Sequence, residues 1–213
     1  MKTVLAYGDS LTWGSCPETG GRHPASHRWP DVLAAALGDS VTVITNGLRG
    51  RTTAYDEYLA DCDRNGVRIL PTIINTYAPV DLVIILLGAN DMKPHICGTA
   101  IGALQGVRRL TQIAKNHMQG LSNGHRAKVL IVAPPPLVES DDPEFRAMFD
   151  GGIEESRKLA SLYEKLAREM DVAFFDAGTV AEASTLDGVH LDAENTKKIG
   201  VALAPHVKKL LAV

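Results

Sequence analysis

Ser10 is the first residue whose type and position suggest chemistry. It lies in the tetrapeptide Gly8-Asp9-Ser10-Leu11, which follows the apolar run at residues 3–6 and Tyr7. A strand-like run that ends in glycine, with a hydroxyl residue two positions on, predicts a strand that stops at a tight turn before a helix. The N–H of Ser10 would then lie among the unpaired donors of that helix, where negative charge is favoured. This suits a nucleophile whose attack creates an oxyanion; the alternative is that Ser10 only caps the helix.

Polar groups follow three further strand-like runs. Gly47 and Gly50 come after the second run, where they let the backbone turn tightly and offer its N–H groups. Asn90 follows the third run and brings a side-chain amide with two donors. Asp187 and His190 follow the fifth run, spaced so that the imidazole reaches a serine while the carboxylate accepts from its other ring nitrogen. Each residue alone also fits a turn or a cap, but together they stand in the order that acyl transfer requires.

The elements that would position these residues alternate along the chain. Strand-like runs lie at residues 3–7, 41–45, 81–87, 128–133 and 172–175, and helical patterns lie at residues 29–37, 71–77, 101–117, 154–170 and 193–211. Several strand runs are continuously apolar, as strands covered on both faces are. The pattern predicts an α/β fold: a three-layer α/β/α sandwich around a five-stranded parallel sheet in flavodoxin-like order, with the ligand crevice at the carboxyl ends of the strands. Because repeats and linkers are absent from the sequence, we expect residues 1–213 to form a single catalytic domain.

Composition narrows the class of protein. The chain has 213 residues, 45% hydrophobic and 22% charged, with a net charge of -3, which is typical of a globular protein and gives no electrostatic case for nucleic acid. No apolar run has the length of a membrane span or of a secretory signal, so we predict a cytoplasmic protein with no membrane partner. The spacing of Cys16, Cys62 and Cys97 fits neither a disulfide framework nor a zinc site, which predicts free thiols.

The sequence resembles the SGNH superfamily of GDSL esterases and lipases in four blocks: Gly-Asp-Ser-Leu at 8–11, Gly-Leu-Arg-Gly at 47–50, Gly-Ala-Asn-Asp at 88–91 and Asp-Gly-Val-His at 187–190. Segments 8–14, 51–53, 134–137 and 174–178 further resemble the bacterial arylesterase and acyltransferase branch, some members of which perform perhydrolysis. One departure is Cys16, which stands where we expect a bulky aromatic residue in the best acyltransferases of that branch. The departure bears on acyl transfer and not on hydrolysis.

The resemblance implies a role for each residue of the site. Ser10 is the expected nucleophile, His190 the general base and then acid, and Asp187 the group that orients the imidazole. The expected oxyanion hole combines the N–H of Ser10, the N–H of Gly50 and the side chain of Asn90. Gly47 is the alternative to Gly50 as the second backbone donor. The sequence has no dinucleotide or Walker fingerprint, and its other histidines lack ligand spacing, so no metal or cofactor is expected.

Residues around the nucleophile are expected to bind the substrate. We assign Asp9, Leu11 and Trp13 to this role, with Trp13 and residues 14–29 as a wall of the entrance; a purely structural tryptophan is the alternative. Arg49 and Arg51 are interpreted as solvated or interface residues in preference to contacts of an anionic substrate.

The resemblance also implies assembly into a homo-oligomer, with an octamer as the suggested form. In the long segment 47–70, Tyr55, Tyr58 and Leu59 are candidate interface residues. A mouth narrowed by neighbouring copies favours short acyl chains. We therefore expect a serine esterase that hydrolyses acetyl-type esters of aryl or simple alcohols through an acyl-enzyme, with acyl transfer or perhydrolysis as further outcomes. A carbohydrate acetylesterase with the same triad and a non-catalytic binding protein are the alternatives.

Overall fold

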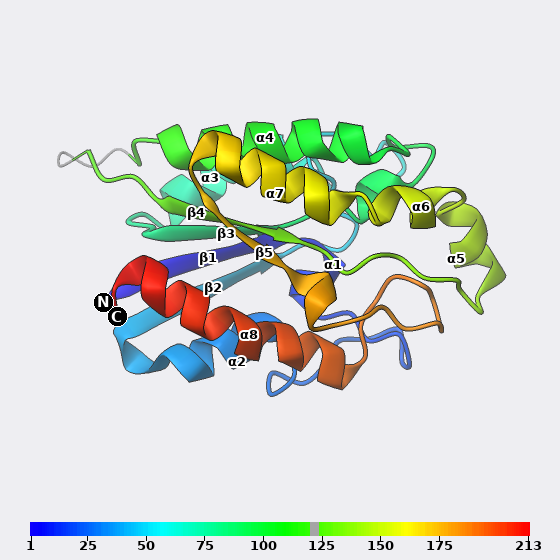
Figure 1. Cartoon of the computed structure of the whole chain (residues 1–213), viewed down its shortest axis with the longest axis horizontal. Coiled ribbons are helices and arrows are strands. Elements are labelled where there is room, and N and C mark those ends of the chain that lie inside the picture. The colour runs from blue at the N-terminus through cyan, green and yellow to red at the C-terminus, as the bar shows by residue number, and fades with distance from the viewer. Residues whose placement is uncertain (120–123) are drawn as a thin grey trace.

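A computed structural model describes residues 1–119 and 124–213 of the chain. Its centre is a five-stranded sheet in which every neighbouring pair is parallel, in the order β2-β1-β3-β4-β5. The strands are β1 (Lys2–Gly8), β2 (Val41–Gly47), β3 (Leu82–Leu86), β4 (Lys128–Ala133) and β5 (Ala173–Asp176). Helices lie on both faces (Figure 1). The predicted fold class and the flavodoxin-like strand order are therefore confirmed.

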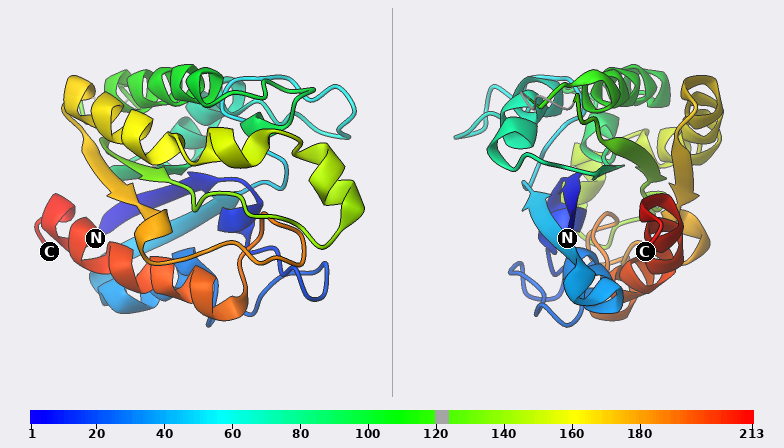
Figure 2. Two further views of the ribbon diagram at one scale, coloured as in Figure 1. Left: turned by 45° about the vertical axis from the view of Figure 1, so that its right-hand side comes forward. Right: turned by 90° about the vertical axis from the view of Figure 1, so that its left-hand side faces the viewer.

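Two sets of helices sandwich the sheet. Helices α3 (Gly66–Thr76), α4 (Ala100–Asn116) and α7 (Leu159–Met170) cover one face, and α2 (Trp29–Leu37) and α8 (Ala193–Leu211) cover the other (Figures 1 and 2). Three short helices, α1 (Ser10–Trp13), α5 (Pro143–Met148) and α6 (Gly152–Ser156), and three 3₁₀ turns, η1 (Gly38–Ser40), η2 (Asn90–Met92) and η3 (Ala177–Thr179), complete the fold. Both chain termini lie at the end of the sheet opposite to α1.

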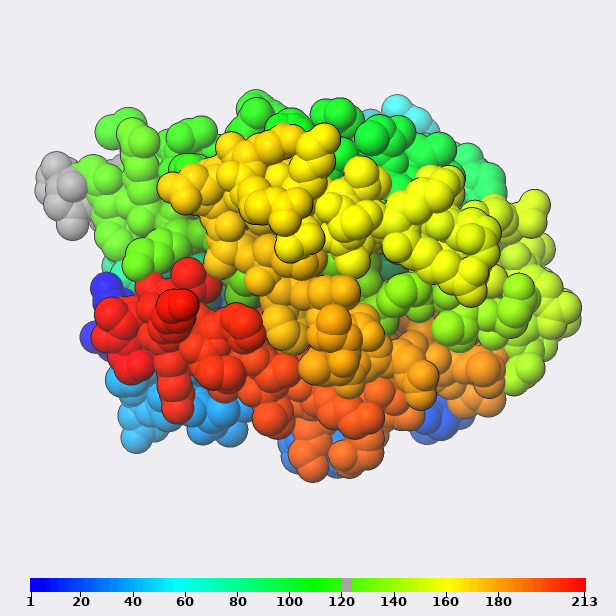
Figure 3. Space-filling model, in the orientation of Figure 1, coloured from blue at the N-terminus to red at the C-terminus, as the bar shows by residue number. Residues whose placement is uncertain are grey.

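The continuous apolar runs of the sequence are explained by burial on both faces of the sheet. In β3, Val83 and Ile85 pack under α3, α4 and α7, whereas Leu82 and Ile84 pack under α2 and α8. Burial of each such side chain contributes about 1.5–3 kcal/mol. The edge strand β5 is only partly buried and lies between the side chains of α7 and α8 in the space-filling view (Figure 3).

The strand register places the chemistry at one edge of the sheet. Gly8, the last residue of β1, pairs with Gly47 at the end of β2 and with Leu86 at the end of β3. Because three parallel strands end level with one another, the segments that follow them emerge side by side. The sheet thus brings together three of the sequence blocks that are far apart along the chain.

Some predicted helices differ from the observed ones. The helix predicted at 71–77 begins earlier, at Gly66, because the side chain of Asn65 accepts a hydrogen bond from the N–H of Arg68 and caps it. The helix predicted at 154–170 is divided into α6 and α7. At the division, the hydroxyl of Ser156 donates to the carbonyl of Ile153 and accepts from the N–H of Leu137, which ties the end of α6 to the neighbouring loop.

Candidate active site

The turn after β1 presents the hydroxyl of Ser10. Asp9 is the cap of α1, because its Oδ1 accepts from the N–H of Leu11 at 2.9 Å. The alternative that Ser10 only caps this helix is therefore wrong. Gly8 is required here, since a Cβ atom at this position would lie 2.0 Å from Oγ1 of Thr12. The result is a sharp turn that leaves the side chain of Ser10 free for another partner.

Ser10, His190 and Asp187 form a continuous hydrogen-bonded chain. Oγ of Ser10 lies 2.9 Å from Nε2 of His190, and Nδ1 of His190 lies 2.6 Å from Oδ2 of Asp187. The serine comes from the first turn after β1, and the other two residues come from the loop that precedes α8. The structure thus joins residues separated by 180 positions in the sequence.

The carboxylate of Asp187, which contacts the imidazole of His190, also shapes the loop that carries this histidine. Oδ1 of Asp187 accepts from the N–H groups of Val189 and His190, so the side chain folds back over its own turn. Gly188 has a φ of 76°, and a Cβ there would lie 2.6 Å from the carbonyl oxygen of Val138. Glycine is therefore needed for the tight approach of this loop to the segment after β4.

The ionisation of Asp187 sets the tautomer of His190. Burial raises the pKa of this carboxyl, but the hydrogen bond and charge of His190, together with the two backbone N–H groups, hold the pKa below its ordinary value. An ionised carboxylate only accepts, so Nδ1 of His190 is the donor and Nε2 presents its lone pair to the hydroxyl of Ser10. This arrangement can remove the serine proton during attack on a carbonyl carbon.

Three candidate oxyanion donors line one pocket. Nδ2 of Asn90 lies 3.4 Å from Oδ2 of Asp9 and 3.2 Å from the carbonyl oxygen of Arg51, which holds the amide at the pocket. Gly50, with a φ of 78°, lines the pocket together with Ser10 and Asn90. Gly47 instead lies beneath α1, where a Cβ would be 2.2 Å from the backbone N of Trp13. Between the two glycines, this geometry favours Gly50 as a backbone donor to the site.

Comparison with known proteins identifies the family of this chain. A sequence model of the GDSL-like lipase/acylhydrolase family matches residues 6–196. The chain belongs to this family. No match is found among curated proteins in a direct sequence comparison.

Solved structures similar to this GDSL-like hydrolase span essentially its whole length. A carbohydrate acetylesterase family member from Sinorhizobium meliloti is 54% identical, with complete coverage of both chains and a TM-score of 0.98. The aryl esterase of M. smegmatis is 39% identical and covers 99% of this chain and 100% of its own, with a TM-score of 0.93. Est24, a carbohydrate acetylesterase from S. meliloti, is 40% identical over the same coverage, with a TM-score of 0.92. The chain is a carboxylic ester hydrolase.

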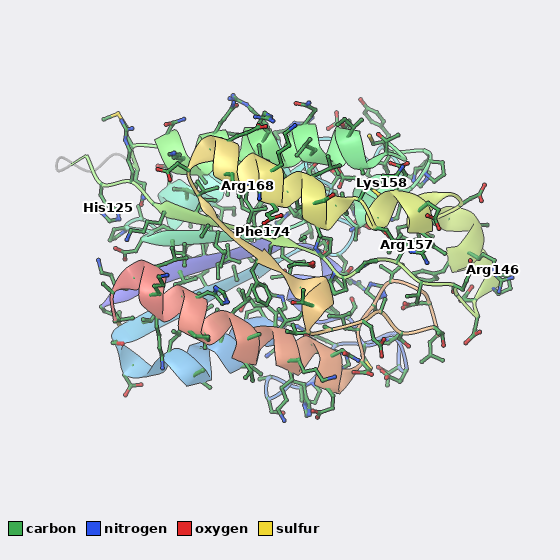
Figure 4. The ribbon with its side chains drawn as sticks, in the orientation of Figure 1. His125, Arg146, Arg157, Lys158, Arg168 and Phe174 are labelled. Atoms are coloured by element: carbon green, nitrogen blue, oxygen red, sulfur yellow. The ribbon has the colours of Figure 1, made fainter. Side chains whose placement is uncertain are left out.

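The hydrolase has a pocket of about 330 Å³ at the Ser10–His190 pair. Helix α5 and the residue after it form its apolar wall with Phe145, Met148 and Phe149, and the ring of Phe145 meets the ring of His190 edge-on at 6.1 Å. Figure 4 shows α5, marked by Arg146, at one end of the molecule. Larger hollows of about 580 Å³ and 640 Å³ lie elsewhere, between α3 and α4 and beside β4, without Ser10 or His190.

Sequence reasoning missed this apolar wall because it missed α5. The signal for the helix is present: Asp142 caps it through the N–H groups of Glu144 and Phe145, and Pro143 occupies its first turn. An aspartate followed by proline and glutamate thus marks a helix start that the hydrophobic pattern of this short segment does not reveal.

The three residues predicted to bind substrate lie elsewhere than expected. Leu11 points into the core with α2 and α8, so its assignment to substrate binding is corrected. Asp9 is fully buried beneath the pocket, where it holds α1 and Asn90. Trp13 does not line the pocket but stacks with the guanidinium of Arg49, at 4.9 Å, and Arg49 does line it. In the enzyme, Trp13 therefore positions a pocket residue.

Arg51 is structural, contrary to the expectation of a solvated or interface residue. It is buried, stacks on the ring of Tyr7 at 4.1 Å, and donates through Nη1 to the carbonyl oxygens of Gly8 and Asn46. The guanidinium thus ties the ends of β1 and β2 together behind the turn that carries Ser10.

Two acids are buried beneath the pocket of the hydrolase. Burial raises the pKa of Asp9 to about 6 and that of Asp91 to about 7. Asp91 accepts from the N–H and the hydroxyl of Thr53, and Asp9 accepts from Leu11 and Asn90. Both acids hold neighbouring loops in place without lining the pocket themselves.

Among the residues that the structure describes, one group of potential metal ligands lies outside the site. Cys16, Glu18 and His23 offer ligand atoms within 4.8 Å of one another, and Nε2 of His23 donates to the carbonyl oxygen of Leu191 at 2.9 Å. The group has one ligand fewer than a closed structural zinc site. The three cysteines are free thiols, as predicted. Among the described residues, no helix has the length and apolar character that crossing a membrane requires.

Proposed function

We propose that the protein is a serine esterase that hydrolyses short-chain, acetyl-type esters of aryl or simple alcohols. The observation that supports this most strongly is the chain of hydrogen bonds from Ser10 through His190 to Asp187 at the mouth of a small pocket. Ser10 is the nucleophile, His190 the base and then the acid, and Asp187 the group that holds the imidazole in its reactive tautomer.

Acylation begins when the hydroxyl of Ser10 attacks the ester carbonyl carbon and gives its proton to Nε2 of His190. The carbonyl oxygen becomes an oxyanion that accepts hydrogen bonds from the N–H of Ser10, the N–H of Gly50 and the side chain of Asn90. The intermediate then collapses, the bond from carbon to the alcohol oxygen breaks, and His190 returns the proton to the leaving alcohol.

Deacylation repeats these steps with water in place of the serine. His190 takes a proton from water, the hydroxide attacks the acyl-enzyme, and the imidazolium returns the proton to Ser10 as the acid leaves. An alcohol in place of water would give a new ester, and hydrogen peroxide would give a peracid. We propose transfer to an alcohol and transfer to hydrogen peroxide as minor routes only, because Cys16 stands where we expect an aromatic residue in efficient acyltransferases.

The size of the pocket supports a short acyl group. About 330 Å³ is near the lower limit for small-molecule sites, and Phe145 of α5 together with Phe149, which follows it, closes one side of the pocket. The second candidate function is carbohydrate acetyl ester hydrolysis with the same triad. It is favoured by two of the similar structures, which are described as carbohydrate acetylesterases.

The decisive experiment compares the wild-type enzyme with Ser10→Ala on 4-nitrophenyl acetate, butyrate and octanoate. We expect the wild type to be fastest on acetate and the variant to lose turnover while its circular dichroism is unchanged. Ser161→Ala, an exposed serine of α7, is the matched control and should behave as wild type. Octanoate as the best substrate would contradict the short-acyl pocket, and equal rates of wild type and Ser10→Ala would contradict the serine mechanism. A set of sugar acetates then distinguishes the two candidate functions.

Three broader assignments accompany this proposal. Residues 1–213 act as one catalytic domain, supported by the family match at 6–196 and by a sheet whose strands extend from Lys2 to Asp176. Three free cysteines support the cytoplasm as the compartment. A homo-oligomer is supported by Tyr58 and Leu59, which expose 87% and 91% of their surface on the long loop after β2.

A further inference from the structure

The pocket beside Ser10 is strongly cationic. Arg49, Arg64 and Lys93 all line it, and among the described residues no aspartate or glutamate does. The three side chains come from two segments: both arginines belong to the loop between β2 and α3, and the lysine directly follows η2. Positive charge from separate parts of the fold thus converges on the volume where the substrate must lie.

Lys93 is the most constrained of the three. Its side chain is buried, with 9% of the residue exposed. The ammonium lies 5.4 Å from the centre of the ring of Phe149. Burial lowers the pKa of this lysine more than the nearby charges of Glu57, Asp9 and Asp91 raise it. Oε2 of Glu57, the acid that influences it most, lies 3.3 Å from Nε2 of His95.

Arg64 lies against Gly50, the glycine proposed as a backbone donor of the oxyanion hole. A Cβ atom at Gly50 would lie 2.8 Å from Nη1 of Arg64, so the guanidinium covers this glycine. Within residues 1–119 and 124–213, the buried Nε of Arg64 has no hydrogen-bond partner. Arg49 is held at the rim by stacking on Trp13.

Some surface cations are paired with nearby acids. Arg157, Lys158 and Arg168, labelled along α6 and α7 in Figure 4, pair with glutamates three or four residues away. In the part of the chain that the structure describes, none of the three pocket cations forms an ion pair. Because they also line the pocket beside Ser10, these cations are available to a negative group that arrives with a ligand.

We propose that Arg49, Arg64 and Lys93 form a carboxylate-binding subsite beside Ser10, so that the preferred substrates are esters that also carry a carboxylate. This inference rests on the proposed esterase function and specifies its substrate class. The carboxylate is bound and not consumed: water still supplies the hydroxyl to the acyl group and the proton to the alcohol. It can lie on the acyl side, as in a half-ester of a dicarboxylic acid, or on the alcohol side, as in an acetylated hydroxy acid.

Two pairs of esters test the subsite and distinguish the two sides. The acyl-side pair is 4-nitrophenyl hemisuccinate and its methyl ester, and the alcohol-side pair is 4-acetoxybenzoate and its methyl ester. We expect kcat/KM for the charged member to exceed that for the neutral member by about tenfold or more in one pair, the gain typical of one charged hydrogen bond. No preference for the charged member in either pair would overturn the subsite while leaving Ser10-dependent hydrolysis of the neutral esters intact.

Variants of the pocket cations test whether the preference for the charged ester depends on these side chains. Lys93→Met and Arg64→Met should each reduce the charged-to-neutral ratio by about tenfold, and Lys93→Arg should restore much of it because the charge is kept. Arg109→Gln, which removes a cation from the exposed face of α4 outside the pocket, is the matched control and should leave the ratio unchanged. An equal change in Arg109→Gln, or an unchanged ratio in both methionine variants, would overturn the assignment. Competitive inhibition by benzoate but not by benzamide, weakened in Lys93→Met, provides a readout that needs no charged substrate.

Discussion

The side-chain amide of Asn90 can be tested separately from folding, because its contacts are few and weak. Its Nδ2 is 3.2 Å and 3.4 Å from its two acceptors, distances long enough for a developing oxyanion to compete with both. We predict that Asn90→Ala lowers kcat for 4-nitrophenyl acetate by about 10²–10³, as expected for loss of one oxyanion donor. KM and the thermal unfolding midpoint should change little. Near-normal kcat would remove Asn90 from the oxyanion hole.

The sequence predicts which residues meet but not where all neighbouring side chains point. Ser10, Asn90 and His190 follow strands, and parallel strands end at one edge, so their convergence can be inferred from the sequence alone. Leu11 could not be assigned in this way. In a helix of four residues, the packing of α1 against α2 and α8 decides which side chain faces the core.

At the scale of the elements, the contact between α1 and β2 depends on Gly47. A Cβ there would lie 2.2 Å from the backbone N of Trp13 and 2.7 Å from the carbonyl carbon of Thr12, and backbone atoms cannot move aside as a side chain can. We predict that Gly47→Ala lowers the free energy of unfolding by about 1–3 kcal/mol or more. It should also reduce kcat, because α1 begins with Ser10. Urea unfolding and ester hydrolysis measure the two effects.

The matched control for this prediction is Gly21→Ala. The nearest atom to a Cβ at Gly21 is Oγ1 of Thr19 at 3.3 Å, on an exposed loop. This variant should stay within about 0.5 kcal/mol of wild type. If Gly47→Ala were equally stable and active, the close packing of α1 on β2 would not be what positions the nucleophile.

Long elements were predictable because their patterns are strong, and short ones were not. The bounds of α2, α8 and β4 agree with the sequence prediction, since each has a clear apolar period or run. Helix α5 has six residues, fewer than two turns, so its period cannot be recognised, and only its cap reveals it. The same limit applies to the division between α6 and α7, which depends on a tertiary hydrogen bond from Leu137 to Ser156.

The stability of the whole molecule should depend on pH through its buried acids. The pKa of Asp91 rises from an ordinary value of 3.8 to about 7 on folding, so the folded state binds this proton more tightly than the unfolded state. Between these values the unfolding free energy therefore falls as pH rises. Asp9, with a pKa of about 6, acts in the same direction, while Asp187, with a lowered pKa, contributes stability that is lost only at more acidic pH.

We predict that the thermal unfolding midpoint decreases from pH 5 to pH 8 and that Asp91→Asn flattens this decrease. The amide keeps an oxygen for the N–H of Thr53 but has no proton to lose. Asp39→Asn, in the exposed turn η1, is the control and should keep the slope of wild type. A thermal unfolding midpoint that rises with pH across this range would contradict the prediction. It would show that Asp91 ionises in the folded protein with little loss of unfolding free energy.

The long loop after β2 links the assembly of the molecule to its site. Its Tyr58 and Leu59 expose nearly all of their surface, and removal of such apolar area from water would stabilise contact with a second copy. We predict that light scattering shows an oligomer for the wild type and a smaller species for Leu59→Glu. Val201→Glu, an exposed apolar position on α8, is the control and should keep the mass of wild type.

Because Gly50 and Arg64 of the pocket flank this loop, dissociation of the oligomer should also widen the range of acyl chains that the enzyme accepts. A monomeric wild type, or an unchanged preference for acetate after dissociation, would separate the loop from the narrowing of the site.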